Sequence, residues 1–176
     1  MNQLEKVFFK KICFDKDAFK SKNILSDKIY NKKILVIGGA GTIGSNYIKQ
    51  ISKFKPSKIT VVDINENGLT ELTRDLRSSN LLNYEPEYIT YPVNLLSNTF
   101  EKIFNSDTWQ VVANFSAHKH VRSEKDKISV EALIKNNVFG AIKLLNLCEG
   151  NPPNYFFSVS TDKAANPVNI MGASKS

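Results

Sequence analysis

Two short stretches of the sequence carry residues that could bind a ligand or move a proton. The first, Gly38 to Gly44, reads GGAGTIG and has a glycine at every third position. In the second, Thr161, Asp162 and Lys163 stand side by side. A glycine-rich turn lets backbone amides approach an anion, and a hydroxyl, a carboxyl and an amine together can exchange protons with a substrate. Both uses depend on the elements that hold these residues.

Five apolar runs of strand length alternate with segments whose apolar residues recur at helical spacing. This alternation is typical of a doubly wound α/β fold, in which helices cover both faces of a parallel sheet. Pro92 falls in the third run and predicts that this strand frays or lies near an edge, because proline cannot donate a ladder hydrogen bond. The predicted strands are Ile34–Ile37, Ile59–Val62, Tyr88–Val93, Val111–Phe115 and Tyr155–Ser160.

Four helices are predicted between these strands, and each of the first three carries one apolar stripe. We expect these stripes to pack against the sheet. They comprise Ile43, Tyr47, Ile48 and Ile51 after the first strand, Leu69, Leu72 and Leu76 after the second, and Phe100, Ile103 and Phe104 after the third.

The fourth helix is the longest, from about Ser129 to Leu147, and it ends before Gly150 and Pro152. Its apolar stripe contains one polar residue, Asn137, which must find hydrogen-bond partners if it is buried. A role in a binding site and a contact with a neighbouring loop would both meet this need. The other members of the stripe are Val130, Leu133, Ile134, Ala141, Leu144, Leu145 and Cys148.

The totals limit the class of protein. A chain of 176 residues with 41% hydrophobic content predicts one domain over residues 32–176, preceded by a helical and loop extension over residues 1–31. The net charge of +7 comes from lysines scattered among acidic residues, so we expect no nucleic-acid partner. No stretch approaches the roughly 20 apolar residues of a membrane span, and Cys13 and Cys148 have no metal-ligand spacing. We expect a cytoplasmic protein without metal.

The glycine pattern follows the first predicted strand directly and opens the first helix. In that context Gly38 permits a tight turn, Gly41 lets the backbone approach a diphosphate, and Gly44 allows the helix to pack close to the strand. Thr42 and Ile43, at the start of the helix, complete the phosphate site. The pattern therefore predicts the NAD(P)-binding Rossmann fold.

The choice of dinucleotide depends on Asp63, at the end of the second strand and about 20 residues after the last glycine. A carboxylate there can bind the adenosine ribose hydroxyls but would repel a 2′-phosphate. The sequence thus favours NAD over NADP. Asn94 and Leu95, after the third strand, are expected to form the adenine pocket.

Three strings resemble the polysaccharide-biosynthesis branch of the extended short-chain dehydrogenases, which includes the UDP-N-acetylglucosamine 4,6-dehydratases. They are NFSAHKHV (114–121), NVFG (137–140) and STDKAANP (160–167), and the resemblance covers about residues 32–176. It implies bound NAD and a UDP-N-acetylhexosamine substrate that becomes a 4-keto-6-deoxy sugar. It also implies cofactor contacts at Ser116, Ala117, Lys119 and Asn137, and contact of Lys175 with the nicotinamide ribose.

In the implied reaction, hydride leaves the sugar C4, a base removes the C5 proton, and water leaves from C6. Lys163 is the candidate base if part of it is neutral, and Asp162 the candidate acid for the departing hydroxyl. The usual tyrosine of these enzymes is replaced by Met171, which cannot move a proton. Thr161 or Asp162 must then receive the C4 hydroxyl proton. Phe115 also departs from the family, which has small residues at this point of the fourth strand.

Other interpretations remain open at this stage. A UDP-sugar epimerase would use the same fold, although it needs no acid–base pair to eliminate water. A non-catalytic dinucleotide-binding module is the second alternative, and Asp162 and Lys163 would then form a surface ion pair. The sequence stops at Ser176, before the region that binds the sugar nucleotide in the extended family. We therefore expect a fragment with little or no turnover, whose parent protein forms a homo-oligomer.

Overall fold

The sheet contains five strands, all parallel. A computed structural model describes residues 21–118 and 126–176, and Lys119 therefore lies outside the described residues. Neighbouring strands pair in an unbroken parallel register. The strands are β1 (Lys33–Ile37), β2 (Lys58–Asp63), β3 (Glu87–Pro92), β4 (Val111–Asn114) and β5 (Tyr155–Ser158).

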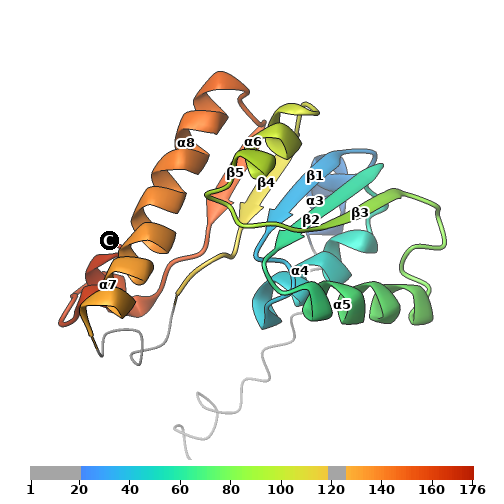
Figure 1. The fold of residues 1–176 in the computed structure, drawn as a ribbon. Helices are drawn as coiled ribbons and strands as arrows, with labels where there is room; N and C mark the ends of the chain where they lie inside the picture. Colours follow the sequence, from blue (N-terminus) through green and yellow to red (C-terminus); the bar gives the residue numbers. More distant parts are fainter. Residues whose placement is uncertain (1–20, 119–125) are drawn as a thin grey trace, which may run out of the picture.

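The strand order is β3-β2-β1-β4-β5, so the chain reverses its direction of winding between β1 and β4 (Figure 1). The predicted doubly wound parallel fold is confirmed. In such sheets, ligands bind outside the carboxyl ends of the strands at the point of reversal. β3 lies at an edge, as Pro92 predicts, and Pro92 is itself paired with Asp63.

Helices cover both faces of the central strands. They are α3 (Lys22–Ile29), α4 (Thr42–Ser52), α5 (Glu66–Ser78), α6 (Asn98–Asn105), α7 (Lys127–Ile134), α8 (Gly140–Gly150) and α9 (Ile170–Ala173). Two single-turn segments join them, a π turn, η2 (Lys135–Phe139), and a 3₁₀ turn, η3 (Asp162–Ala164).

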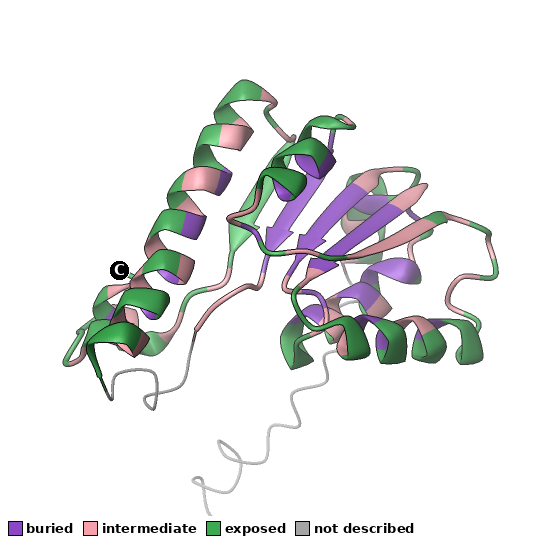
Figure 2. Ribbon diagram, in the orientation of Figure 1, coloured by how far each residue is buried: buried purple, intermediate pink, exposed green. Residues whose placement is uncertain are grey.

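Strand β1 separates two apolar cores. Ile34 and Val36 face the core that contains α4 and α5, whereas Leu35 and Ile37 face the core that contains α6 and α8. All four side chains are almost fully buried, which explains why the strand reads as a continuous apolar run. Figure 2 shows this burial along β1, β2 and β4. The predicted stripes after the second and third strands are buried as expected.

The sheet is not covered on both faces at β5, where the prediction was wrong. Tyr155, Phe156 and Phe157 all remain partly exposed at this edge (Figure 2). Strands β4 and β5 also end earlier than predicted, at Asn114 and Ser158. The chain leaves the sheet there and forms the loops above its carboxyl edge.

The predicted fourth helix is interrupted by η2. A π turn holds an extra residue, which shifts the side chains after it around the helix axis. Asn137 and Leu144 are buried as predicted, whereas Leu145 is 49% exposed. The prediction that Leu145 belongs to the buried stripe was therefore wrong.

A group of charges at the amino ends of the strands ties β1, β2 and β4 together. Asp107 Oδ1 lies 2.7 Å from Lys33 Nζ, and its Oδ2 lies 3.1 Å from Lys58 Nζ. Burial alone would raise the pKa of Asp107, but hydrogen bonds from Lys33, Lys58 and Thr108 bring that pKa below its ordinary value of 3.8. This group lies at the opposite end of the strands from the reversal site.

The described residues contain neither a membrane-spanning helix nor a cluster of metal ligands. None of the helices within residues 21–118 and 126–176 is long and apolar enough to cross a membrane. In the same residues, no three His, Cys, Asp or Glu side chains gather in a way that could hold a metal ion. The division at residue 31 stays a prediction.

Candidate functional site

Two adjoining cavities lie at the carboxyl ends of the strands. The first has a volume of about 310 Å³ and the second about 200 Å³. Both are lined by Gly38, Gly41, Phe115 and Ala117, so together they form one crevice across the reversal of strand order. This is the position at which the topology predicts a ligand.

The glycine turn separates β1 from α4 and borders both cavities. Gly38 has a φ of 73°, and a Cβ on it would lie 2.5 Å from the amide nitrogen of Ser116. A Cβ on Gly44 would collide with the Gly38 carbonyl oxygen. At Gly41 the same test gives an ordinary contact of 3.5 Å. Packing within the chain explains Gly38 and Gly44. Only a ligand close to the turn would require a glycine at position 41.

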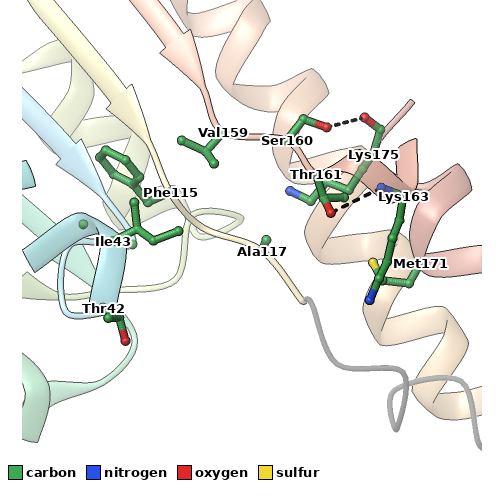
Figure 3. Close-up of a pocket in the computed structure, with 13 residues that line it drawn as sticks. Thr42, Ile43, Phe115, Ala117, Val159, Ser160, Thr161, Lys163, Met171 and Lys175 are labelled. Atoms are coloured by element: carbon green, nitrogen blue, oxygen red, sulfur yellow. Dashed lines mark hydrogen bonds between the residues drawn. The ribbon is translucent and has the colours of Figure 1, made fainter. Parts of the chain in front are cut away.

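The amino end of α4 faces the first cavity. Its N-cap, Gly41, has no side chain to accept a hydrogen bond. Among the described residues, no acceptor is found for the backbone amides of Thr42, Ile43 and Gly44. Such free amides bind anions well. The Ile43 side chain is 56% exposed and lines the first cavity, so the prediction that it packs in the core was wrong (Figure 3).

Asp63 holds the turn against the end of β2. Its two carboxylate oxygens accept hydrogen bonds from the amides of Ala40 (2.9 Å) and Asn65 (3.0 Å). The residue also lines the second cavity, together with Asn94 and Leu95. The three residues predicted to surround an adenosine are thus brought together.

The segment after β4 is fixed by a buried asparagine. Asn114 donates to the Ser158 hydroxyl at 3.1 Å and accepts from the amide and hydroxyl of Ser116 at 3.0 and 2.6 Å. These bonds set the path of the chain through Ser116 and Ala117, which line the crevice as predicted.

The opposite wall of the first cavity is formed by Val159, Ser160, Thr161, Lys163, Met171 and Lys175 (Figure 3). Gly41 and Lys163 therefore line the same cavity, as the predicted chemistry requires. Burial lowers the pKa of Lys175, which makes its ammonium group easier to deprotonate. The Lys175 carbonyl accepts a hydrogen bond of 3.0 Å from Ser160, which fixes this part of the wall.

Thr161 and Asp162 form a bonded pair beside the cavity. The Thr161 hydroxyl donates to Asp162 Oδ1 at 2.8 Å, and this bond lowers the pKa of Asp162. Asp162 itself is not among the residues that line the first cavity. Within the described residues no ion pair joins Asp162 to Lys163, although the Lys163 charge also contributes to the lowered pKa of Asp162.

Asn137 is buried in η2 and joins two walls of the crevice. Its Oδ1 accepts from the His118 amide at 2.9 Å, and its Nδ2 donates to the His118 carbonyl at 3.0 Å. The same Nδ2 donates to the Ser174 hydroxyl at 2.9 Å. Asn137 lines neither the first nor the second cavity, so the structure gives it a positioning role instead of direct contact with the crevice.

Sequence reasoning missed several lining residues. Asn136 lines the second cavity, and helical periodicity could not find it because the π turn changes the phase there. His118 and Ser160 were quoted only as parts of the family strings, although both line the crevice. Each follows the carboxyl end of a strand, and this position alone could have predicted that it lines the crevice.

Comparisons with known proteins agree with this geometry. A family model described as "Polysaccharide biosynthesis protein" matches residues 34–176. An uncharacterized membrane protein of Methanocaldococcus jannaschii is 34% identical over 151 residues, which cover 86% of this chain and 42% of that protein. The UDP-N-acetylglucosamine 4,6-dehydratase (inverting) of Campylobacter jejuni is 30% identical over 145 residues, which cover 82% of this chain and 40% of the enzyme.

A solved structure of the UDP-Glc/GlcNAc 4-epimerase from Campylobacter jejuni superposes with a TM-score of 0.70 at 23% identity, over 82% of this chain and 46% of that one. This likeness shows the fold alone. The chain spans less than half the length of each of these proteins. Because the family model extends from β1 through α9, the chain belongs to the polysaccharide biosynthesis protein family.

Proposed function

We propose that this chain is the cofactor-binding part of an NAD-dependent nucleotide-sugar 4,6-dehydratase. The observation that carries the proposal is the shared cavity, which has the glycine turn on one wall and Thr161 and Lys163 on the other. The 30% identity to a UDP-N-acetylglucosamine 4,6-dehydratase supports the choice of reaction. The chain covers 40% of that enzyme, so the complete activity is proposed for a protein of the relatives' length.

The crevice suits NAD in both of its halves. The free amides of α4 and the open face of Gly41 would hold the diphosphate. Asp63 would bind the adenosine ribose, with Asn94 and Leu95 beside the adenine. Lys175 would hold the ribose of the nicotinamide half in the first cavity. NAD held in this way would supply reversible hydride transfer for the oxidation at C4 and the reduction at C6.

The Thr161–Asp162 hydrogen bond provides a route for the C4 proton in the absence of the usual tyrosine. Thr161 accepts the proton of the C4 hydroxyl and passes its own proton to Asp162 along the 2.8 Å bond. The lowered pKa of Asp162 means that it starts ionised and can accept this proton. Asp162, which lies beside the cavity and would have to turn towards it, then gives this proton to the departing C6 hydroxyl, which leaves as water.

Lys163 completes the proton balance. Its neutral amine takes the C5 proton while water leaves, and its ammonium form returns that proton to C5 when hydride reaches C6. Every proton taken up by the protein is thus released within the cycle, and the net change is the loss of one water from the sugar.

Product analysis tests the proposal. A longer protein that contains this chain, supplied with NAD and UDP-N-acetylglucosamine, is expected to give a product lighter by one water. Lys163→Ala in that protein should abolish the product and leave NAD binding unchanged. A product of unchanged mass would identify an epimerase instead. Residues 1–176 alone are expected to bind NAD without turnover.

A further inference from the structure

Phe115 occupies the junction of the two cavities. Four residues line both cavities, and the other three are Gly38, Gly41 and Ala117, which have no side chain beyond a methyl group. The Phe115 ring is thus the only large side chain among the shared residues. Any ligand long enough to occupy both cavities must pass it.

The ring is held by two other aromatic residues from different elements. Tyr47 of α4 lies 5.2 Å from it between ring centroids, and Phe157 of β5 lies 5.8 Å away at an interplanar angle of 82°. Tyr47 and Phe157 also contact each other at 5.5 Å. Tilted and edge-to-face pairs of this kind are the favoured aromatic geometries. Each of the three rings thus contacts the other two, and of the three only Phe115 lines the cavities.

The backbone of Phe115 is fixed as well. Its amide donates to the Ile37 carbonyl at 2.7 Å, which extends the pairing between β1 and β4 by one bond. A Cβ on Gly38 would lie 2.7 Å from the Phe115 carbonyl carbon, so the glycine turn packs directly on this residue. These contacts fix the position of Phe115 relative to the glycine turn. Figure 3 shows Phe115 on the α4 side of the first cavity, across from Lys163 and Met171.

We propose that Phe115 is a ligand-binding residue whose ring supports the central diphosphate–ribose segment of a dinucleotide as it crosses between the cavities. The ring offers carbon atoms but no hydrogen-bonding group, whereas the α4 amides lie on the same crevice. A crossing ligand therefore turns its phosphates to the amides and its ribose carbons to the ring. This inference rests on the proposed binding of NAD.

A series of three ligands tests it. AMP fills the adenosine side only, ADP-ribose adds the crossing segment, and NAD adds the nicotinamide. In Phe115→Ala we expect the affinities for ADP-ribose and NAD to fall by about tenfold, the size of a good ring contact, and the affinity for AMP to change by less than about twofold. The readout is the dissociation constant by calorimetry, which requires no turnover.

Two further variants control for folding. Phe115→Leu keeps an apolar side chain and should retain most of the affinity for ADP-ribose. Phe139→Ala removes a ring that is 53% exposed on the helix surface and lines neither cavity, so it should leave all three affinities unchanged. Circular dichroism of each variant shows whether the fold is kept.

The outcomes are distinct. Equal losses for AMP and ADP-ribose would show that Phe115 only maintains the fold, and unchanged affinities would show that the ligand does not touch it; either result overturns the inference. Wild-type protein that binds neither NAD nor AMP would overturn the proposed function itself, and this inference with it.

Discussion

The side-chain amide of Asn137 lies 2.9 Å from the hydroxyl of Ser174 and so joins η2 to the segment that carries Met171 and Lys175. The same amide group holds the backbone of His118 on the other side. One buried residue thereby sets the distance between the loop after β4 and the wall after β5.

We predict that Asn137→Leu lowers the free energy of unfolding by about 3 kcal/mol, because it leaves the His118 amide and carbonyl without their partner and removes the bond that Ser174 accepts, although the Ser174 hydroxyl still donates to the Met171 carbonyl. Urea denaturation measures the change. Asn146→Leu, at an exposed position of the same helical stretch, is the matched control. Equal stability of the two variants would contradict the role given to Asn137.

Gly41→Ala should separate binding from folding. Its Cβ would meet only an ordinary 3.5 Å contact, so we expect a stability change within about 0.5 kcal/mol. The added methyl group would intrude on a diphosphate, and the affinity for NAD should fall by more than about tenfold.

Gly44→Ala is the counterpart, since its Cβ collides with the Gly38 carbonyl, and it should destabilise the fold itself. Thermal unfolding and NAD titration of both variants check the pair. Loss of stability in Gly41→Ala would show that this glycine serves the chain's own packing.

The carboxylate of Asp63 should determine the choice between NAD and NADP. Asp63→Asn keeps an oxygen that can accept from the Ala40 amide but removes the charge. A 2′-phosphate would then meet no repulsion, and the NADP-to-NAD affinity ratio should rise by about tenfold. Titration with both dinucleotides measures the ratio. Equal effects on the two ligands would mean that Asp63 only supports the turn.

The charge group at Asp107 predicts a pH-dependent stability. Because the pKa of Asp107 in the folded chain lies below 3.8, its contribution is fully present above that value and is lost as the pH falls through the folded pKa. Asp107→Asn should therefore lower the free energy of unfolding by on the order of 2 kcal/mol at neutral pH.

The difference between Asp107→Asn and wild type should shrink as the pH is lowered below 3.8. Denaturant titrations of both proteins across this range supply the test. If the difference in unfolding free energy did not change with pH, the destabilisation by Asp107→Asn would come from packing and not from charge.

The sheet and its turn could be predicted from sequence because their signals are local. A strand buried on both faces, such as Ile34 to Ile37, reads as an unbroken apolar run, and a turn with positive φ at Gly38 admits little besides glycine. These two features also fixed where the crevice had to be. The position of Lys163 on the same cavity as Gly41 followed from strand order.

Features that depend on tertiary packing escaped the sequence. The π turn at residues 135–139 has no periodicity that predicts it, so Asn136 was missed as a lining residue. Leu145 was placed on the buried face but is exposed. The ring cluster around Phe115 brings together Tyr47 and Phe157, which are more than a hundred positions apart in the sequence. The Thr161–Asp162 bond depends on side-chain rotamers that no spacing specifies.

Strand β5 pairs with β4 on one side, and in the described residues no strand pairs with its other side. Its aromatic side chains reach solvent on both faces. An unpaired edge of this kind is a template for pairing with another strand. We therefore expect Phe156→Lys to reduce edge-to-edge aggregation without altering either cavity.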